Sequence, residues 1–422
     1  MTHPNSVDHV VVRYRPGKAP ALNEGARSKG LPELRTEPFL QGENLSAALE
    51  RLNSNPDVLY AEPDFLAQTL SATHTHTPSD PELLTMWAIP KISAPAAWDI
   101  TTGSPSVKIC VVDTGVDYTH PDLAANVLPG YNAITGQADA MDDNGHGTHV
   151  AGIIGAVGDN NEGITGLNWN VGILPCKFMS AAGAGYLSDA IECMFWCRDQ
   201  GAAISSHSWR TTGYSQALYD TMEAIGAEGH LFVTAAGNNG ADNDYGTSAT
   251  SYPAAFNLPY QITVSATDSN DVLSSWSSYG AATAHLAAPG VNIFSTGTTA
   301  DDQAYIYRSG TSMAAAHVSG AAALIKSVRP DFTPSQIKVS LLSNTDTAPS
   351  LAGKVVSSGR LNVNRAVRAA AQAMLPSMQQ KLRRSATEPA SPVLNTLGRR
   401  VAPGKRFDNI KSTFASVIST RR

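Results

Sequence analysis

The sequence predicts an α/β protein with a mainly parallel central sheet and helices on both faces, preceded by a small α+β unit. Two observations carry this prediction. From about Asp80 to Ala370, short apolar runs typical of strands alternate with segments of helical periodicity, which is the pattern of βαβ units. Before them, residues 8–66 combine two strand-like runs with one helical run. The length of 422 residues suits one large domain with smaller parts.

The individual elements follow from local periodicity. In the large unit, strands are expected at 107–112, 172–178, 202–206 and 231–235, and helices at 146–157, 186–199, 217–228 and 314–328. In the small unit, strands are expected at 10–14 and 58–61 and a helix at 45–52. About 60 residues are marginal for a core that folds alone, so this unit is expected to be accessory.

Charge is distributed unevenly along the chain. Residues 377–422 carry a net charge of +8 and the remaining chain −14, and an acidic body disfavours nucleic-acid binding. Beyond Leu375 the composition shifts to Gln, Ser, Pro and basic residues. A flexible extension is therefore expected over 376–422, either solvated or in contact with an anionic membrane or partner.

The four cysteines are expected to be reduced. Cys110 and Cys176 lie in apolar strand-like runs, where a thiol packs as a small hydrophobe. Cys193 and Cys197 are four residues apart in a helical segment, which separates their Cβ atoms by roughly 5–6 Å and disfavours a bridge between them. The spacing is not that of a zinc site.

The first residues, Met1 to Val12, lack the apolar run of a signal peptide. No run approaches the ~18 apolar residues of a membrane span. Either the protein stays inside the cell or its leader is missing, so the compartment is left undetermined.

Three segments contain residues suited to nucleophilic catalysis. An apolar strand over 111–117 contains Asp113, and the ends of parallel strands face the functional crevice of α/β sheets. Within 142–152, His146 opens a helix between two glycines. Within 309–320, Ser312 begins an Ala-rich helix, where the helix dipole favours the negative charge that acyl transfer generates.

Taken singly, each of these residues has a plainer structural alternative. Asp113 could cap a helix or a turn, and Ser312 could be an N-cap. His146 and His149 are three apart and could bind a metal ion, although no Glu lies between them as in metalloprotease helices.

Together, the three segments in the order Asp, His, Ser resemble the signatures of the subtilisin-like (S8, subtilase) family, from Asp80 to about Ala370. The resemblance implies a subtilisin-like three-layer fold over 71–375 and serine endopeptidase activity. It assigns Ser312 as nucleophile, His146 as general base and then acid, and Asp113 as the group that orients the imidazole. Asn238 matches the oxyanion-hole amide of the family.

The resemblance also implies a substrate cleft in which the peptide adds as a strand between two edge segments. The residues expected to contact it are Gly183, Ala184, Gly185, Ser208, Trp209, Ala235, Ala236, Gly237 and Ser251. None of these is acidic, so a medium or large apolar P1 residue is favoured over Lys or Arg. Trp209 and Arg210 replace the small glycines common in the family and are expected to narrow or recharge the cleft.

A structural Ca²⁺ site is implied by two loops that resemble those of the family. The expected ligands are Asp80, Asp122, Asn160, Glu162 and Ile164. Carboxylate, amide and backbone oxygens suit Ca²⁺. The alternative is an Asn/Gly turn with capping aspartates.

Residues 1–70 resemble the inhibitor I9-type propeptide of the family through the segment 57–64. The resemblance implies a self-processing zymogen cleaved between Leu70 and Ser71, with Leu70 in the primary pocket. The expected partners are polypeptide substrates and the protein's own propeptide, which would act as an intramolecular inhibitor. The enzyme is expected to be a monomer. Family analogy also suggests a secreted or endomembrane protein.

One position departs from the family pattern. Ala316 stands where the family usually has proline after the nucleophile. Ala keeps the helix, but loss of the rigid ring could shift Ser312, and misplacement by about 1 Å can cost ~10²-fold in rate. Three functions stay open: a hydrolytic endopeptidase, which is favoured, a peptide ligase or macrocyclase on the same triad, and a non-catalytic scaffold.

Overall fold

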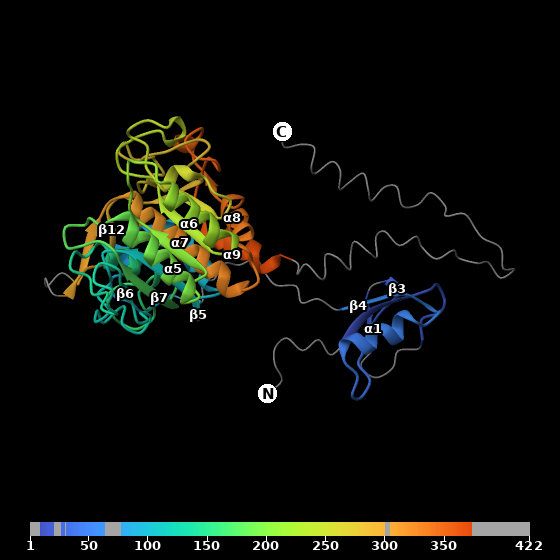
Figure 1. The fold of residues 1–422 in the computed structure, drawn as a ribbon. Coiled ribbons are helices and arrows are strands. Elements are labelled where there is room, and N and C mark those ends of the chain that lie inside the picture. The colour runs from blue at the N-terminus through green and yellow to red at the C-terminus, as the bar shows by residue number, and fades with distance from the viewer. Residues whose placement is uncertain (1–8, 21–26, 30, 64–76, 300–303, 374–422) are drawn as a thin grey trace. The chain divides into compact units, whose positions relative to one another are not determined.

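The computed structural model describes residues 9–20, 27–29, 31–63, 77–299 and 304–373. They belong to two compact units, one made of the described residues up to 63 and one of those from 77 onward (Figure 1). The expected processing bond between Leu70 and Ser71 and the basic extension over 376–422 lie outside the described residues.

The small unit is a four-stranded antiparallel sheet with one helix. Its strands pair in the order β2-β3-β1-β4. The elements are β1 (His9–Tyr14), β2 (Arg27–Lys29), β3 (Leu31–Pro38), α1 (Leu45–Asn53) and β4 (Val58–Pro63). Val10 and Val12 alternate along β1 and are buried against Ala48 and Leu52 of α1, as expected for a strand with one covered face. The predicted α+β architecture is confirmed, with β2 and β3 additional to the sequence prediction.

The large unit is built on a nine-stranded sheet in the order β14-β15-β11-β10-β9-β8-β5-β7-β6. All neighbours pair in parallel except β14 with β15. The strands are β5 (Gly103–Asp113), β6 (Tyr131–Asn132), β7 (Asn170–Lys177), β8 (Ile204–His207), β9 (Leu231–Ala235), β10 (Gln261–Thr267), β11 (Leu286–Pro289), β14 (Asp346–Thr347) and β15 (Gly359–Arg360). A separate hairpin pairs β12 (Ile293–Thr296) with β13 (Tyr305–Arg308).

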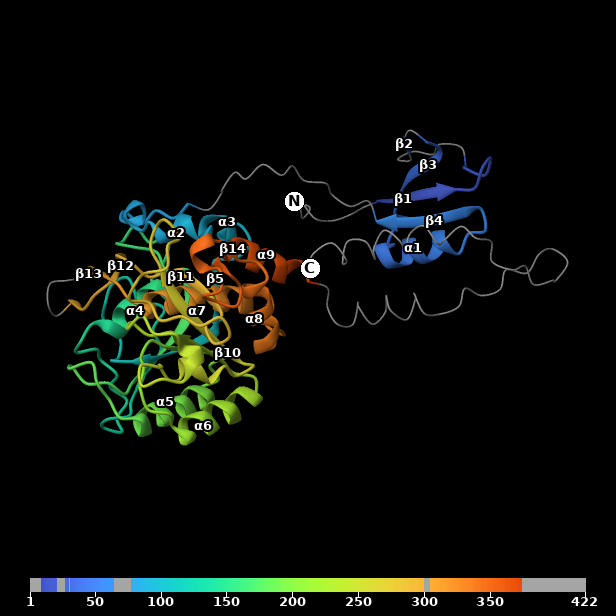
Figure 2. The same cartoon turned by 90° about the horizontal axis from the view of Figure 1, so that it is seen from above.

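Helices cover both faces of this sheet. They are α2 (Ala88–Lys91), α3 (Ala94–Trp98), α4 (His146–Gly155), α5 (Leu187–Asp199), α6 (Gln216–Ala227), α7 (Thr311–Val328), α8 (Pro334–Leu342) and α9 (Val363–Gln372). Figure 2 shows α5 and α6 on one side of the strands and α2, α3 and α9 on the other. No helix in the described ranges is long and apolar enough to cross a membrane.

Alternation along β5 explains the three layers. Ile109 and Val111 join the core shared with α4 and α7, whereas Cys110 and Val112 join the core beneath α5 and α6. Every residue from Ile109 to Asp113 is buried, as in a parallel strand covered on both faces. The predicted mainly parallel α/β fold is confirmed.

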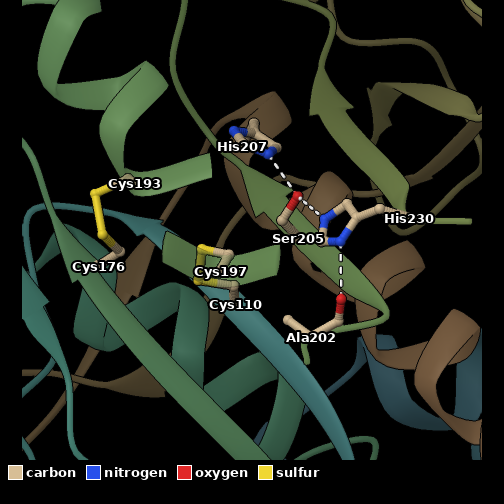
Figure 3. The surroundings of a disulfide bond; sticks show 8 residues. All are labelled: Cys110, Cys176, Cys193, Cys197, Ala202, Ser205, His207 and His230. Carbon is tan, nitrogen blue, oxygen red and sulfur yellow. Dashed lines mark hydrogen bonds between the residues drawn. A yellow bond between two sulfur atoms is a disulfide. The ribbon is translucent and has the colours of Figure 1, made fainter. Parts of the chain in front are cut away.

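The cysteines form two disulfides, Cys110–Cys197 and Cys176–Cys193 (Figure 3). The expectation of four reduced thiols was wrong. Cys193 and Cys197 do not pair with each other, but α5 lies across the adjacent strands β5 and β7. This arrangement brings the Cα atoms of the two pairs to 5.9 and 5.7 Å, within bridging range.

Candidate active site

Asp113 and His146 form the first half of the site. β5 ends at Asp113 and α4 begins at His146, and His146 Nδ1 lies 2.7 Å from Asp113 Oδ1. Because an ionised carboxylate only accepts hydrogen bonds, Nδ1 is the donor and Nε2 is left for a further partner. Burial lowers the pKa of His146, but the charge of Asp113 and this hydrogen bond outweigh it and hold the pKa above its usual value.

The loop before α4 is held by Asp142. Its Oδ1 accepts the N–H groups of Asn144 and Gly145, both at 3.0 Å, and its Oδ2 accepts the N–H and hydroxyl of Thr148. Gly145 itself is left-handed, with φ of 88°, a conformation that favours glycine. These contacts fix the backbone at the start of α4 and thereby the direction in which the His146 side chain points.

His149, one turn further along α4, faces a different part of the protein. Its Nε2 lies 3.1 Å from Ile293 O and 3.2 Å from Ile306 O. Burial lowers its pKa to about 3, with Arg308 and His146 contributing. His146 and His149 therefore bond to separate groups and do not converge on one ligand.

Ser312 stands in the first turn of α7 and exchanges hydrogen bonds with Ser208. Ser312 Oγ donates to Ser208 O at 3.0 Å, and Ser208 Oγ donates to Ser312 O at 3.1 Å. Within the described part of the chain, no hydrogen bond joins Ser312 Oγ to His146. Both residues line the same cleft, and transfer of the Ser312 proton to His146 would require the hydroxyl to give up its hydrogen bond to Ser208 O.

Among the described residues, only the oxygen of the Asn238 side-chain amide has hydrogen-bond partners. Its Oδ1 accepts the N–H of Thr311 at 2.9 Å and the Thr311 hydroxyl at 2.8 Å. These donors identify the oxygen of the amide, so Nδ2 is the free end. Nδ2 lies 3.3 Å from where a Cβ on Gly310 would stand, beside the start of α7.

A cleft of about 340 Å³ joins these groups. It is lined by Thr114, Asn144, His146, Met179, Gly183, Ser208, Trp209, Arg210, Ala235, Gly237, Asn238, Arg308, Thr311 and Ser312. Five of the expected substrate contacts are in this set, and four are not: Ala184, Gly185, Ala236 and Ser251.

Ser251 nevertheless supports the wall of the cleft from behind. It is fully buried, and a Cβ on Gly237 would lie 2.3 Å from its Oγ. Only glycine fits there, and its φ of 112° also favours glycine. The wall at Ala235 and Gly237 is thus small and backed by a hydroxyl.

Trp209 and Arg210 differ in exposure. Trp209 is 6% exposed, and its ring packs edge-on against Phe178 at 5.1 Å and against His207 at 5.6 Å. Arg210 is exposed at the rim. The pair therefore changes the charge of the cleft, while most of the tryptophan is taken up by the core.

Sequence reasoning missed Arg308 and Lys177. Arg308 reaches the cleft from the end of the β12–β13 hairpin. Lys177, at the end of β7, is buried and donates to Thr114 O, Asp143 Oδ1 and Met179 O at 2.6 to 2.8 Å. It ties the ends of β5 and β7 together beneath the cleft. Neither position carries a local pattern, because its role depends on elements distant in sequence.

The expected calcium ligands lie on two loops that meet. Asp122 Oδ1 accepts from Asn160 Nδ2 at 2.8 Å and Oδ2 from the N–H of Ile164 at 2.9 Å. Asp80 Oδ2 accepts the N–H of Asp159 at 2.8 Å, and its buried Oδ1 has no partner among the described residues. Glu162 is exposed.

The charge at these loops fits an oxygen-ligated cation. Burial raises the pKa of Asp122 to about 6, and the charge of Asp80 adds to this. Two buried carboxylates that repel each other are costly unless compensated, and carboxylate, amide and backbone oxygens suit Ca²⁺. In the described ranges no three His, Cys, Asp or Glu residues cluster as a metal site, so amide and backbone oxygens would have to complete the set.

Comparisons with known proteins identify the family of this chain. The profile of the subtilase family matches residues 104–370. A thermophilic serine proteinase of Bacillus sp. strain AK1 is 40% identical over 285 residues, 67% of this chain and 67% of the relative. Thermitase of Thermoactinomyces vulgaris is 38% identical over 293 residues, 69% of this chain and 99% of the relative.

Among solved structures, a protease of Pseudoalteromonas arctica superimposes with a TM-score of 0.61 at 30% identity. The match covers 70% of this chain and 100% of that one. The chain therefore belongs to the subtilase family and is a subtilisin-like serine endopeptidase.

Proposed function

We propose that Ser312, His146 and Asp113 are the catalytic triad of this endopeptidase and that Asn238 is an oxyanion-hole donor. The observation that carries the proposal is the convergence of His146, held by Asp113, with Ser312 and Asn238 in one cleft. A capping serine or a turn aspartate would need no such convergence.

The mechanism uses two nitrogen atoms that have no hydrogen-bond partner among the described residues, His146 Nε2 and Asn238 Nδ2. Ser312 Oγ leaves Ser208 O, gives its proton to His146 Nε2 and attacks the scissile carbonyl. The oxyanion of the tetrahedral intermediate accepts from Asn238 Nδ2 and from the N–H of Ser312. His146 then protonates the leaving amine, and water repeats the sequence on the acyl-enzyme.

The primary pocket favours an apolar P1 residue. Ala235 and Gly237 present small walls to the cleft, and no Asp or Glu is among the described residues that line it. A P1 Lys or Arg would therefore lack a counter-charge, whereas burial of an apolar side chain is favourable.

Residues 1–70 are proposed to be an inhibitory propeptide removed between Leu70 and Ser71. The division of the described residues into two compact units supports this, as does the apolar P1 preference proposed above, which suits Leu70. N-terminal sequencing of the active protein should begin at Ser71, and a mature end beyond about Asp80 would contradict it.

Ca²⁺ is proposed to be a structural cofactor held by Asp80, Asp122 and Asn160, with Glu162 and the Ile164 carbonyl as further candidate ligands. The orphaned Oδ1 of Asp80 is the supporting observation. The ion would supply positive charge to two buried carboxylates and take no part in peptide hydrolysis.

The test of function compares wild type with Ser312→Ala. Wild type should be processed and should hydrolyse peptides with Leu at P1, whereas Ser312→Ala should keep its full length and be inactive. Ser309→Ala is a matched control, because Ser309 is exposed and outside the cleft lining. An active Ser312→Ala protein would contradict the assignment.

The same experiment separates hydrolysis from ligation. α7 runs without interruption through Ala316, which is fully buried, so the helix that presents Ser312 does not depend on the family proline. With an added amine nucleophile, free acid should remain the main product. Predominant amide product would instead identify a peptide ligase.

A further inference from the structure

Arg308 stands in the cleft with most of its hydrogen-bonding capacity unused. A guanidinium has five N–H donors, but the described residues offer Arg308 one long contact, from Nη2 to Asn144 O at 3.4 Å. Its Nε is buried without a partner among them, and it forms no ion pair with a described carboxylate. The half-buried side chain lines the cleft, so it faces the space that a substrate would enter.

Arg308 lies beside the start of α4, next to His146. Its Nη2 is 3.2 Å from where a Cβ on Gly145 would stand, and Gly145 precedes His146. In the proposed mechanism His146 protonates the leaving amine. The peptide beyond the scissile bond therefore begins next to His146 and lies close to Arg308. Arg308 is close enough to influence the imidazole through its charge.

Arg210, the other arginine of the cleft, belongs to a segment that pairs with the backbone next to Ser251. It is followed by Thr211, which pairs with Tyr252 through reciprocal backbone hydrogen bonds of 2.8 and 2.9 Å. Tyr252 is adjacent to Ser251 behind the wall of the primary pocket. Arg210 is therefore expected near the acyl half of the substrate, before the scissile bond, whereas Arg308 is expected near the leaving segment.

We propose that Arg308 binds the side-chain carboxylate of an Asp or Glu at the first or second position of the leaving segment, P1′ or P2′. The inference rests on the proposed function of the cleft. A planar guanidinium pairs with a carboxylate through two parallel hydrogen bonds. No described carboxylate lines the cleft to compete for Arg308, so the site selects acidic residues just beyond the scissile bond.

The test uses C-terminally amidated peptides with Leu at P1 and with Glu, Gln or Lys at P1′ or P2′. We expect kcat/KM for the better Glu peptide to exceed that for its Gln counterpart about tenfold, and the ratio to shrink with added salt. Arg308→Gln should reduce the ratio to about one, and Arg308→Glu should favour Lys. Arg210→Gln, the matched control in the same cleft, should preserve the ratio.

Equal kcat/KM for Glu and Gln peptides at both positions would overturn the proposal, as would a ratio that survives Arg308→Gln. A preference present only in peptides with a free C-terminus would assign Arg308 to the α-carboxylate of a short leaving segment and also overturn it. Thermal melting of each variant checks that it is folded.

Binding to Ser312→Ala protein from which added wild-type enzyme has removed residues 1–70 separates this proposal from the proposed function. Fluorescence anisotropy with labelled peptides should give a Kd about tenfold lower for the Glu peptide than for the Gln peptide. This binding preference without any cleavage by wild type would refute the catalytic assignment and leave the role of Arg308 standing. Cleavage by wild type without this binding preference would refute the role of Arg308 and leave the catalytic assignment standing.

Discussion

Thr311 donates two hydrogen bonds to the Oδ1 atom of Asn238, from its N–H at 2.9 Å and from its hydroxyl at 2.8 Å. The residue just before the proposed nucleophile therefore orients the proposed oxyanion donor. The same hydroxyl accepts the N–H of Gly237 at 3.1 Å, which ties the wall of the primary pocket to the start of α7. One side chain thus couples the three parts of the site.

Thr311→Val tests this coupling. Valine keeps the shape but loses the hydroxyl, so Asn238 would be held by one donor instead of two. We expect kcat to fall about tenfold with a smaller change in KM, and Thr311→Ser, which keeps the hydroxyl, to restore most of the rate. Equal kcat for Thr311→Val and wild type would show that the N–H of Thr311 suffices.

Asn238→Leu should have a larger effect, because it removes the donor itself. We expect kcat to fall about 10²–10³-fold, the size of effect known for oxyanion donors in subtilisins, with KM little changed. An increase in KM with kcat unchanged would place Asn238 in substrate binding instead.

The pH dependence of kcat/KM should report His146. General-base catalysis requires the neutral imidazole, and Asp113 holds the pKa of His146 above 6.5 despite its burial. Activity should therefore rise with pH through an apparent pKa above 6.5. Because the charge of Arg308 lowers this pKa, Arg308→Gln should move the rise to higher pH. A rise at unchanged or lower pH in the variant would contradict the electrostatic link.

Acid should destabilise the fold through buried histidines beside the disulfides. His207 Nε2 and His230 Nε2 lie 2.7 and 2.8 Å from Ser205 Oγ (Figure 3). Burial lowers the pKa of His207 to about 3, with repulsion from His230, and that of His230 to about 4. In the unfolded chain both histidines have a pKa near 6.5. The unfolded chain therefore binds more protons than the folded chain between about pH 4 and 6.5. The free energy of unfolding must therefore fall as the pH drops through this window.

His207→Phe isolates one of these groups. The measurement uses the Ser312→Ala background, which prevents self-cleavage. There His207→Phe should reduce the slope of the free energy of unfolding against pH by about 1.4 kcal/mol per pH unit between about pH 4 and 6. Ser205 keeps His230 as a partner, so stability at pH 8 is expected to change much less. An unchanged slope in chemical denaturation would mean that His207 is not neutral in the folded state.

Both disulfides should be present in the native protein and should stabilise it. They join residues 87 and 17 positions apart, and closing loops of such lengths contributes about 3–5 kcal/mol each in the chain-entropy account. Alkylation of native Ser312→Ala protein should find no free thiol, and Cys176→Ala with Cys193→Ala should lower Tm by several degrees. Alkylation of all four thiols without reductant would contradict the pairing.

Removal of calcium should lower Tm. With Ser312→Ala protein, EDTA should reduce Tm and added Ca²⁺ should restore it, because the ion binds the folded state only. Asp122→Asn should abolish this response. A Tm that is independent of Ca²⁺ in the parent protein would exclude the proposed cofactor.

The strand and the helix that present two members of the proposed triad could be predicted from the sequence for a local reason. An apolar strand that ends in Asp113 and an Ala-rich helix that begins near Ser312 are continuous segments, so periodicity alone predicts where each side chain emerges. The predicted helix start at Ala314 was three residues late, because Gly310 and Thr311 gave no apolar signal. Asn238 came only through the family resemblance.

Features made by distant segments could not be read in this way. The disulfides depend on α5 crossing two strands, and Arg308 enters the cleft from a hairpin outside the main sheet. The hydrogen bond from Ser312 to Ser208 O is likewise a tertiary contact. In each case the partner lies far along the chain, where periodicity carries no information.

The most direct test of the account is the site of covalent labelling by a fluorophosphonate, identified by peptide mass spectrometry. Such a reagent reacts with a serine only where a base and an oxyanion site activate it. We predict a single adduct on Ser312 in wild type, slower labelling of Asn238→Leu, and none of Ser312→Ala. An adduct on another serine, or none in folded wild-type protein, would contradict the assignment of Ser312 as the nucleophile.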